Sequence, residues 1–240
     1  MARTILVTGG GTGIGRALVE HFAAHGDRVF LTGRRPGPLK DVTEALPAVT
    51  ALVCDHTDPA ALTDLVAALP ERLDVLVNNA GGNTDFDADG SADLAAYARD
   101  FRANLDANLV SAALTTRALS GRLAADGAVI HIGSIAADQG AGAYGAAKAG
   151  LASWNVDLAR ELGARRITAN VVSPGYIAGT EFFRDRLADA RREQLIAATA
   201  TGRPGAVDDI TGAVAFLASP AARHLTGQVL NVNGGAHPTR

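Results

Sequence analysis

Cysteine is almost absent from this chain of 240 residues, in which Cys54 is the only one. A single cysteine excludes an internal disulfide and is typical of proteins that stay in a reducing compartment. The sequence also lacks any apolar run that approaches the ~20 residues of a membrane-spanning helix, and a strand pattern starts at residue 4 without a signal region before it. We therefore expect a cytoplasmic protein with no membrane partner.

An excess of charge of either sign is lacking too. Charged residues make up 20% of the chain and the formal net charge is -3, so there is neither the basic surface of a nucleic-acid-binding protein nor an acidic tail. His21 and His25 have the spacing of metal ligands on a helix, but the expected glutamate does not follow His21 and no third ligand is nearby. We expect no nucleic-acid partner and no metal.

What the sequence does have is a regular alternation of strand and helix patterns. Apolar segments typical of buried strands lie at residues 4–7, 28–32, 51–54, 74–77, 128–132, 167–172 and 228–232. The clearest helix patterns lie at residues 16–25, 94–123, 144–162 and 207–218. This order predicts an α/β protein with one domain, residues 1–240: a Rossmann fold with a doubly wound, seven-stranded parallel sheet flanked by helices. A mixed, charged segment at residues 176–203 is expected to form a helical lid.

A glycine-rich turn follows the first predicted strand and leads into the first predicted helix. Its glycines, Gly9, Gly13 and Gly15, have the spacing Gly-x-x-x-Gly-x-Gly. The free N–H groups and the positive end of the helix dipole at such a turn form a site for an anion such as a pyrophosphate. The turn therefore indicates a dinucleotide cofactor.

The end of the second predicted strand bears on which dinucleotide is bound. NAD-binding proteins carry an acidic residue there, whereas this chain has Arg34 and Arg35 and no acid. Arg34 is suited to pair with the 2′-phosphate of NADP; the alternative is that both arginines are solvated loop charges. Asp55, at the end of the third strand, is placed to accept a hydrogen bond from the adenine amine.

Three side chains indicate carbonyl chemistry. Ser134 follows a predicted strand, and Tyr144 and Lys148 lie four residues apart on a predicted helix, so both point from one helix face. A lysine cation lowers the pKa of a neighbouring phenol, which then acts as a general acid or base, and a serine hydroxyl can hold the carbonyl oxygen. The alternative is a surface Tyr-Lys pair beside an unrelated serine. A hydrolase nucleophile is not indicated, because Ser134 lacks the Gly-x-Ser-x-Gly elbow and a histidine base.

Together these motifs resemble those of the short-chain dehydrogenase/reductase family, in particular its 3-oxoacyl-carrier-protein-reductase-like ketoreductases. The resemblance covers nearly the whole chain, in five ordered motifs: residues 8–15, 78–81, Ser134 with 144–148, 174–175 and 233–235. It implies that Tyr144 is the acid/base, that Lys148 lowers its pKa and binds the nicotinamide ribose, and that Ser134 holds the substrate oxygen. It further implies that Asn108 holds a helix bend and a proton-relay water, with Asn104 as the rival position.

The resemblance also implies a set of cofactor contacts. The pyrophosphate would be lined by residues of the glycine turn, the adenine by Asp55, the ribose by the segment after the fourth strand, and the nicotinamide by the segment after the sixth. These residues are, in chain order, Gly9, Thr12, Gly13, Ile14, Gly15, Arg34, Asp55, Asn79, Ala80, Gly81, Tyr144, Lys148, Pro174, Gly175 and Ile177.

Two features depart from the family pattern. Ser134 and Tyr144 are ten residues apart, where the family usually has about twelve or thirteen, so the intervening loop is shortened. The threonine after Pro174 and Gly175 comes one residue late, at Thr180. In the family, the helices equivalent to residues 94–123 and 144–162 pair between subunits, which implies a homotetramer.

The resulting hypothesis is an NADPH-dependent oxidoreductase that interconverts a ketone and a secondary alcohol, its partner being a small-molecule substrate. Two alternatives remain: an NAD-dependent alcohol dehydrogenase that works oxidatively, and a non-catalytic NADP-binding regulator. Arg34 argues against the first, and the presence of both Tyr144 and Lys148 argues against the second.

Overall fold

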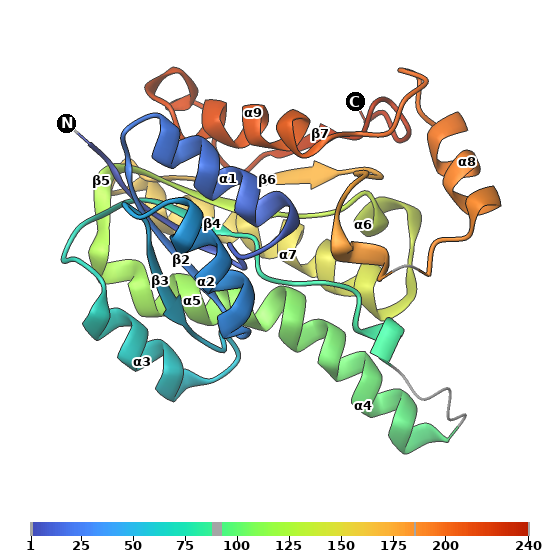
Figure 1. Cartoon of the computed structure of the whole chain (residues 1–240), viewed down its shortest axis with the longest axis horizontal. Coiled ribbons are helices and arrows are strands. Elements are labelled where there is room, and N and C mark those ends of the chain that lie inside the picture. Colours follow the sequence, from blue (N-terminus) through green and yellow to red (C-terminus); the bar gives the residue numbers. More distant parts are fainter. Residues whose placement is uncertain (1, 88–92, 185, 240) are drawn as a thin grey trace.

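A seven-stranded parallel sheet forms the centre of the computed structural model, which describes residues 2–87, 93–184 and 186–239 (Figure 1). The strand order is β3-β2-β1-β4-β5-β6-β7, which confirms the predicted doubly wound α/β fold. The order reverses between β1 and β4, and ligands of such sheets bind beyond the strand ends at this reversal. The strands are β1 Thr4–Thr8, β2 Arg28–Gly33, β3 Thr50–Val53, β4 Leu73–Asn78, β5 Leu123–Ile132, β6 Thr168–Pro174 and β7 Val229–Val232.

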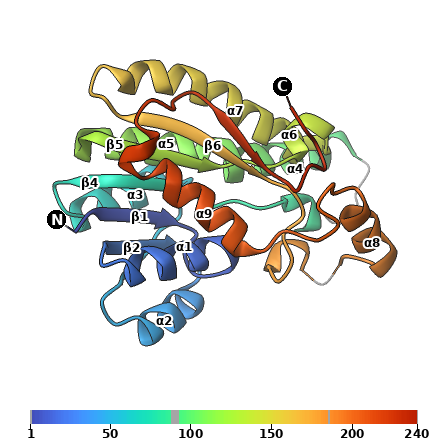
Figure 2. The same cartoon turned by 90° about the horizontal axis from the view of Figure 1, so that it is seen from above.

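Helices cover both faces of the sheet (Figure 2). One face packs against α1 (Gly13–Ala24), α2 (Pro36–Ala45) and α9 (Val207–Leu217). The other packs against α3 (Pro59–Ala68), α5 (Ser111–Leu119) and α7 (Gly142–Gly163), with α4 (Leu94–Leu105) extending beyond the sheet. The short helix α6 (Ala136–Gln139) and α8 (Asp189–Ala197) follow the carboxyl ends of β5 and β6. No helix in the described ranges is long and apolar enough to cross a bilayer.

The strands are buried on both faces, as near-continuous apolar runs predict for a parallel sheet. In β1, Ile5 and Val7 belong to the core beneath α1, α2 and α9, whereas Leu6 belongs to the core beneath α3, α5 and α7. All three side chains are fully buried. Successive residues of a strand point to opposite faces, so one short apolar segment supplies both cores.

The expected helix at residues 94–123 is interrupted, and this corrects the sequence-based boundary. A π-helical turn, Asp106–Val110, separates α4 from α5, and a 3-10 turn, Ser120–Arg122, ends the region because Leu123 already begins β5. The Asn108 amide donates to the carbonyls of Gly82 (2.9 Å) and Asn104 (3.0 Å). These bonds tie the π turn to the loop after β4, and such turns are typical of functional sites.

Two histidines, His56 and His131, are buried in the fold. His56 lies between the hydroxyls of Thr32 and Thr115, each 2.7 Å from a ring nitrogen. His131 lies in β5, where its Nδ1 is 3.1 Å from the Asn78 amide. Burial lowers the pKa of His56 to about 4 and that of His131 to about 3. Both imidazoles are therefore neutral in the folded protein at neutral pH.

We predict that acid destabilises the protein through these two histidines. A group whose folded pKa lies below its unfolded value binds fewer protons when folded, so stability is lost as the pH falls below about 6.5. Between about pH 7 and about pH 5 the loss is on the order of 2 kcal/mol for each histidine, measured by urea unfolding at both pH values. His56→Gln keeps a donor and an acceptor between the threonines and should remove about half of the loss of stability. His224→Gln, at an exposed position, is the control and should leave the loss as it is in the wild type. Equal stability of the wild type at both pH values would contradict the prediction.

Candidate active site

Three polar side chains meet at the carboxyl end of β5. Ser134 follows the strand, while Tyr144 and Lys148 lie on the first two turns of α7. The Ser134 hydroxyl accepts the N–H of Ala136 at 3.1 Å and lies close enough to the Tyr144 hydroxyl to lower the pKa of the phenol against the effect of burial. The Lys148 ammonium donates to the carbonyl of Ile132 at 2.8 Å and lies 5.8 Å from the centroid of the Tyr144 ring. The structure therefore brings together the three residues selected from the sequence.

Burial controls the protonation of this trio. Tyr144 and Lys148 are only 6% and 5% exposed. Burial raises the pKa of Tyr144 to about 12, against the opposing effect of the Ser134 hydrogen bond, and lowers the pKa of Lys148 to about 8. The sequence predicted a lowered tyrosine pKa from the lysine charge, and for this closed structure that direction is wrong. The removal of water from the phenol has the largest effect, so Tyr144 is held as a proton donor.

Asn108 and Asn104 are both buried, but they make different contacts. The Asn108 side chain lies in the π turn, donates to Gly82 O and accepts from Gly82 N (3.0 Å). The Asn104 amide instead accepts from the N–H of Thr84 (3.2 Å) and donates to Asp85 (2.6 Å). Asn108 is therefore the one placed at the helix irregularity, and Asn104 fixes the turn at Thr84–Asp87.

The glycine turn between β1 and α1 has the open backbone that an anion site requires. Gly9 and Gly13 have positive φ values of 63° and 52°, and a β-carbon on Gly9 would come within 2.9 Å of the Ala80 backbone. A β-carbon on Gly15 would overlap with the Gly9 carbonyl, so Gly15 serves the packing of α1 against the turn. Thr12 precedes α1 without a side-chain cap, which leaves the first N–H groups of the helix, including that of Ile14, open toward a ligand.

The segment after β4 is braced against this turn. The Asn79 amide donates to the carbonyls of Thr8 (2.9 Å) and Gly9 (3.0 Å), and the Thr8 hydroxyl accepts from the N–H groups of Asn79 and Ala80. A β-carbon on Gly81 would lie 2.6 Å from the Asn108 side chain. The two strand ends at the sheet reversal are thus held together, with small residues between them.

The two arginines after β2 differ in their contacts. Arg35 pairs with Glu181 at 3.0 Å, whereas exposed Arg34 has no ion-pair partner within the described ranges. Asp55 lies at the next strand end, where the N–H and hydroxyl of Thr57 both donate to its Oδ1 and lower the pKa of its carboxyl group. Arg34 is therefore open to a phosphate, and Asp55 is held as a carboxylate.

The segment after β6 crosses over the glycine turn. Gly175 packs so closely on Asn233 that a β-carbon would come within 2.9 Å of it, and buried Ile177 pairs with Gly205 in an isolated bridge. Thr180 faces Gly13, where a β-carbon would lie 3.6 Å away. The late threonine of the sequence motif therefore still reaches the glycine turn. Position 185 of the expected lid, positions 1 and 240 of the expected domain, and positions 88–92 lie outside the described residues.

Aromatic residues cover the Tyr144 ring, and sequence reasoning did not find this contact. Phe182, in a 3-10 turn at Glu181–Phe183, has its ring centroid 5.6 Å from that of Tyr144. Phe86, in the turn at Thr84–Asp87, is 6.2 Å from Phe182. The only sequence signal was the pair Phe182 and Phe183 in the expected lid, and nothing in the sequence placed Phe86 beside it.

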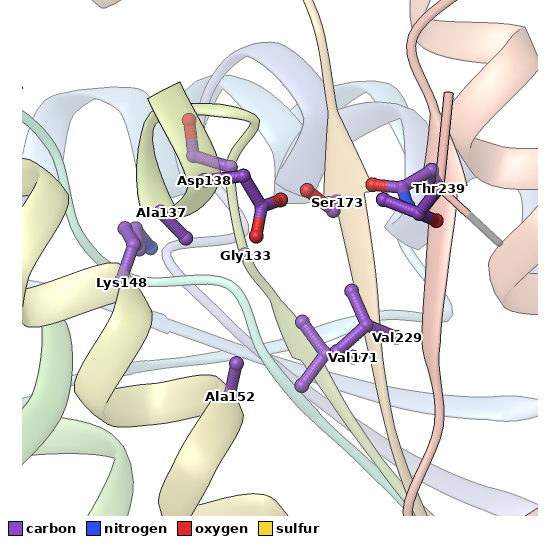
Figure 3. A pocket seen from close by; sticks show the side chains of 11 residues that line it. Gly133, Ala137, Asp138, Lys148, Ala152, Val171, Ser173, Val229 and Thr239 are labelled. Atoms are coloured by element: carbon purple, nitrogen blue, oxygen red, sulfur yellow. The ribbon is translucent and has the colours of Figure 1, made fainter. Parts of the chain in front are cut away.

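A cavity of about 260 Å³ lies beside Ser134 and Lys148, on the side of β6 and β7 (Figure 3). Ser134 and Lys148 form one part of its wall, and Ser173 and Asn231 form another. The Ser173 hydroxyl and the side-chain Oδ1 of Asn231 have no hydrogen-bond partner among the described residues. Apolar side chains, among them Ala152, Val171 and Val229, complete the wall. Lys148 therefore borders a cavity of mixed character as well as the phenol.

These features fit a nicotinamide dinucleotide. A cradle that β-carbons would fill, an uncapped helix start and an open arginine follow the carboxyl ends of β1 and β2, at the edge of the parallel sheet where Ser134 follows β5. No group of three or more His, Cys, Asp or Glu side chains in the described part of the chain could hold a metal ion. His25 Nδ1 instead lies 2.7 Å from the backbone carbonyl of His21.

Known proteins resemble this chain over nearly its full length. The family model described as enoyl-(acyl carrier protein) reductase matches residues 9–237. The 3-oxoacyl-acyl-carrier-protein reductase FabG of Escherichia coli is 37% identical, with 97% of this chain and 96% of the relative covered. A putative oxidoreductase of Mycobacterium tuberculosis is 35% identical, with 97% of each chain covered.

Solved structures are also similar to this chain over nearly its full length. An oxidoreductase of the short-chain dehydrogenase/reductase family from Burkholderia thailandensis superposes with a TM-score of 0.85 at 39% identity, covering 98% of this chain and 93% of that one. A mutant of a Serratia marcescens short-chain dehydrogenase/reductase has a TM-score of 0.85 at 32% identity, covering 98% of each chain. The identity is high enough for the similarity to extend beyond the fold.

We predict that proton donation by this site weakens as the pH rises above about 8. Lys148 is charged below that value and neutral above it, and only the charged form stabilises the phenolate that remains after Tyr144 gives up its proton. The second-order rate constant kcat/KM for carbonyl reduction, measured from about pH 6 to about pH 10, reports this free-enzyme pKa. It should fall by up to about tenfold per pH unit above the inflection, and Lys148→Met should be slow and lack the inflection. A wild-type profile that stays flat to the upper limit would contradict the assignment.

Proposed function

Because the chain belongs to the short-chain dehydrogenase/reductase family and is an oxidoreductase that interconverts a carbonyl group and an alcohol, we propose that it reduces a ketone to a secondary alcohol with NADPH and that Tyr144 is the general acid. The observation that carries the proposal is the grouping of Ser134, whose hydroxyl acts on the Tyr144 phenol, and of the buried Lys148 ammonium 5.8 Å from the Tyr144 ring. The substrate is a small molecule.

The glycine turn and the neighbouring strand ends hold the cofactor in this proposal. Gly9, Thr12, Gly13 and Ile14 offer backbone to the pyrophosphate, while Gly15 keeps α1 close to the turn. Asp55 accepts from the adenine, and Arg34 pairs with the 2′-phosphate. The remaining contacts come from the segment after β4, from α7 and from the segment after β6: Asn79, Ala80, Gly81, Tyr144, Lys148, Pro174, Gly175 and Ile177.

Side chains of the protein orient the carbonyl group and supply the proton. Bound NADPH supplies the hydride. The Ser134 hydroxyl donates to the oxygen of the incoming carbonyl group and fixes its position. Tyr144 gives its proton to the same oxygen, and the Lys148 cation stabilises the phenolate left behind. Asn108 holds the π turn against the loop after β4 and in that way supports the wall of the site.

The alternatives have less support. A non-catalytic NADP-binding regulator has no need for a buried, uncompensated lysine beside a tyrosine, because burying a charge is costly. An NAD-dependent enzyme that works oxidatively would carry an acid where this chain has Arg34. We also propose a cytoplasmic location, which is supported by the free and buried thiol of Cys54.

We propose in addition that the protein is a homotetramer. Two surfaces carry exposed apolar side chains that a monomer has no reason to expose together. On α4 and α7 these are Leu94, Tyr97 and Val156, which are 82%, 63% and 40% exposed. On α9 and the edge strand β7 they are Phe216, Val229 and Leu230. Two separate apolar surfaces suit the two kinds of interface in a tetramer with twofold symmetry.

The test is a panel of ketones and alcohols assayed with NADPH, NADP, NADH and NAD, alongside fluorescence titrations of both reduced cofactors. We expect ketone reduction with NADPH, bound about 10- to 100-fold more tightly than NADH, since a charge-assisted hydrogen bond to phosphate is worth about 1.5–3 kcal/mol. Arg34→Ala should remove this preference by weakening NADPH binding alone. Arg35→Ala is the matched control, because Arg35 already pairs with Glu181, and it should have the smaller effect. If the wild type binds NADH as tightly as NADPH, the cofactor assignment is contradicted. If no ketone or alcohol is turned over with any of the four cofactors, the assignment as an enzyme is contradicted.

A further inference from the structure

Aromatic residues are scarce in this chain, yet they gather at one place. The sequence contains 7 phenylalanines, 3 tyrosines and 1 tryptophan, and five of these eleven rings form a single cluster at the site. Tyr144 is one of them. The other four, which we call the aromatic cap, are Phe86, Tyr176, Phe182 and Phe183. The main cores are built from aliphatic side chains with few rings among them, so the concentration belongs to the site.

The rings of the cap contact one another in a continuous chain that ends on Tyr144. Phe182 is 5.6 Å from Tyr144 and 5.0 Å from Phe183, which it meets edge-to-face at 85°. Phe183 in turn lies 5.9 Å from Tyr176 and 6.3 Å from Phe86. All four distances lie in the range of favourable aromatic pairs. Each ring of the cap is only partly buried, so each keeps an open face.

Polar contacts outside the cluster determine where the cap lies. Arg184, next to Phe183, forms an ion pair with Asp87, next to Phe86. On the other side, Glu181 pairs with Arg35 at 3.0 Å. These pairs are exposed and individually weak, so they position the cap without locking it. The cap can therefore move from Tyr144 at small cost.

Substrate entry requires such a movement. The Tyr144 hydroxyl has to reach the carbonyl oxygen, yet Tyr144 is only 6% exposed and Phe182 covers its ring. When Phe182 moves aside, the contact between these two rings is lost. An aromatic group that enters between them restores a ring contact on each side, whereas an aliphatic group of the same size offers no π system to either ring.

We propose that the natural substrate is a ketone bearing an aromatic ring, and that this ring lies between Tyr144 and the aromatic cap. The inference rests on the proposed function, since the ring is placed by a carbonyl group held at Ser134 and Tyr144. It goes further by naming the substrate class. Phe182 is the residue that determines specificity, because it is the member of the cap in contact with the phenol.

The experiment compares benzylacetone with its analogue that has cyclohexyl in place of phenyl. In both molecules the ring is separated from the carbonyl by two methylene groups, so the intrinsic reactivity of the carbonyl is matched. The cyclohexyl ring is the more hydrophobic, so simple apolar burial would favour it. We expect the wild type to have a kcat/KM about 3- to 10-fold higher for benzylacetone, the range for one aromatic contact.

Variants test the position of the ring. Phe182→Leu keeps the apolar bulk and should clearly reduce the preference for the phenyl substrate, because only the contact with the Tyr144 ring remains. Phe86→Leu, as a second variant, should reduce it less. Phe101→Leu is the control, because Phe101 pairs with Tyr97 at 6.0 Å on α4, outside the cap. It should keep the full preference. An undiminished preference in Phe182→Leu would overturn the assignment.

The outcomes separate this inference from the proposed function. Turnover of both ketones at equal rates, or faster turnover of the cyclohexyl ketone, overturns the aromatic class and leaves the reductase standing. If neither ketone is reduced, calorimetric titration of the two corresponding alcohols into the NADP-saturated protein decides. Tighter binding of the phenyl alcohol then supports the aromatic site although the proposed reaction has failed, and equal binding overturns the inference as well.

Discussion

The buried ammonium group of Lys148 is the constraint on which the site depends. It donates to the carbonyl of Ile132 at the end of β5, and no carboxylate among the described residues pairs with it. A buried cation without a counter-charge is costly, and the protein retains it where α7 meets the central sheet. The same hydrogen bond fixes α7 against β5 and so holds Tyr144 next to Ser134. The hydrogen bond from Lys148 to Ile132 therefore both places Tyr144 beside Ser134 and keeps the lysine cation next to the phenol.

The segment after β6 connects the two halves of the site within a few residues. Thr180 faces the glycine turn at Gly13, Glu181 reaches Arg35 beside the open Arg34, and Phe182 covers Tyr144. A cofactor that occupies the glycine turn and a substrate that reaches the phenol therefore both contact this segment. In the closed arrangement it keeps water from Tyr144 and raises the pKa of the phenol to about 12, so its position determines the proton affinity of the catalytic group.

The sequence predicted those parts of the molecule that local patterns specify. Apolar runs gave the seven strands, and the spacing of Ser134, Tyr144 and Lys148 brought three distant positions to one place, because strand ends and helix faces are regular. It did not predict the π turn around Asn108, which depends on bonds to Gly82. The sequence did not predict the contact of Phe86 with Phe182 either, because the two residues are far apart along the chain and meet only in the folded protein. The predicted direction of the Tyr144 pKa shift was wrong for the same reason. The residues around Tyr144 in the sequence do not indicate that a distant segment of the chain buries its ring.

The central claim is that Tyr144 delivers the proton, and the most direct test is the Tyr144→Phe variant, assayed for kcat on any ketone that the wild type reduces and titrated with NADPH by fluorescence. The ring and its packing against Phe182 and Lys148 are retained, so the fold and nearly all NADPH affinity should be unchanged. Turnover should fall by more than the ~10²–10⁴ usual for a single acid/base group, because the same hydroxyl also orients the carbonyl. Near-normal turnover in the variant would show that this motif is not the active site.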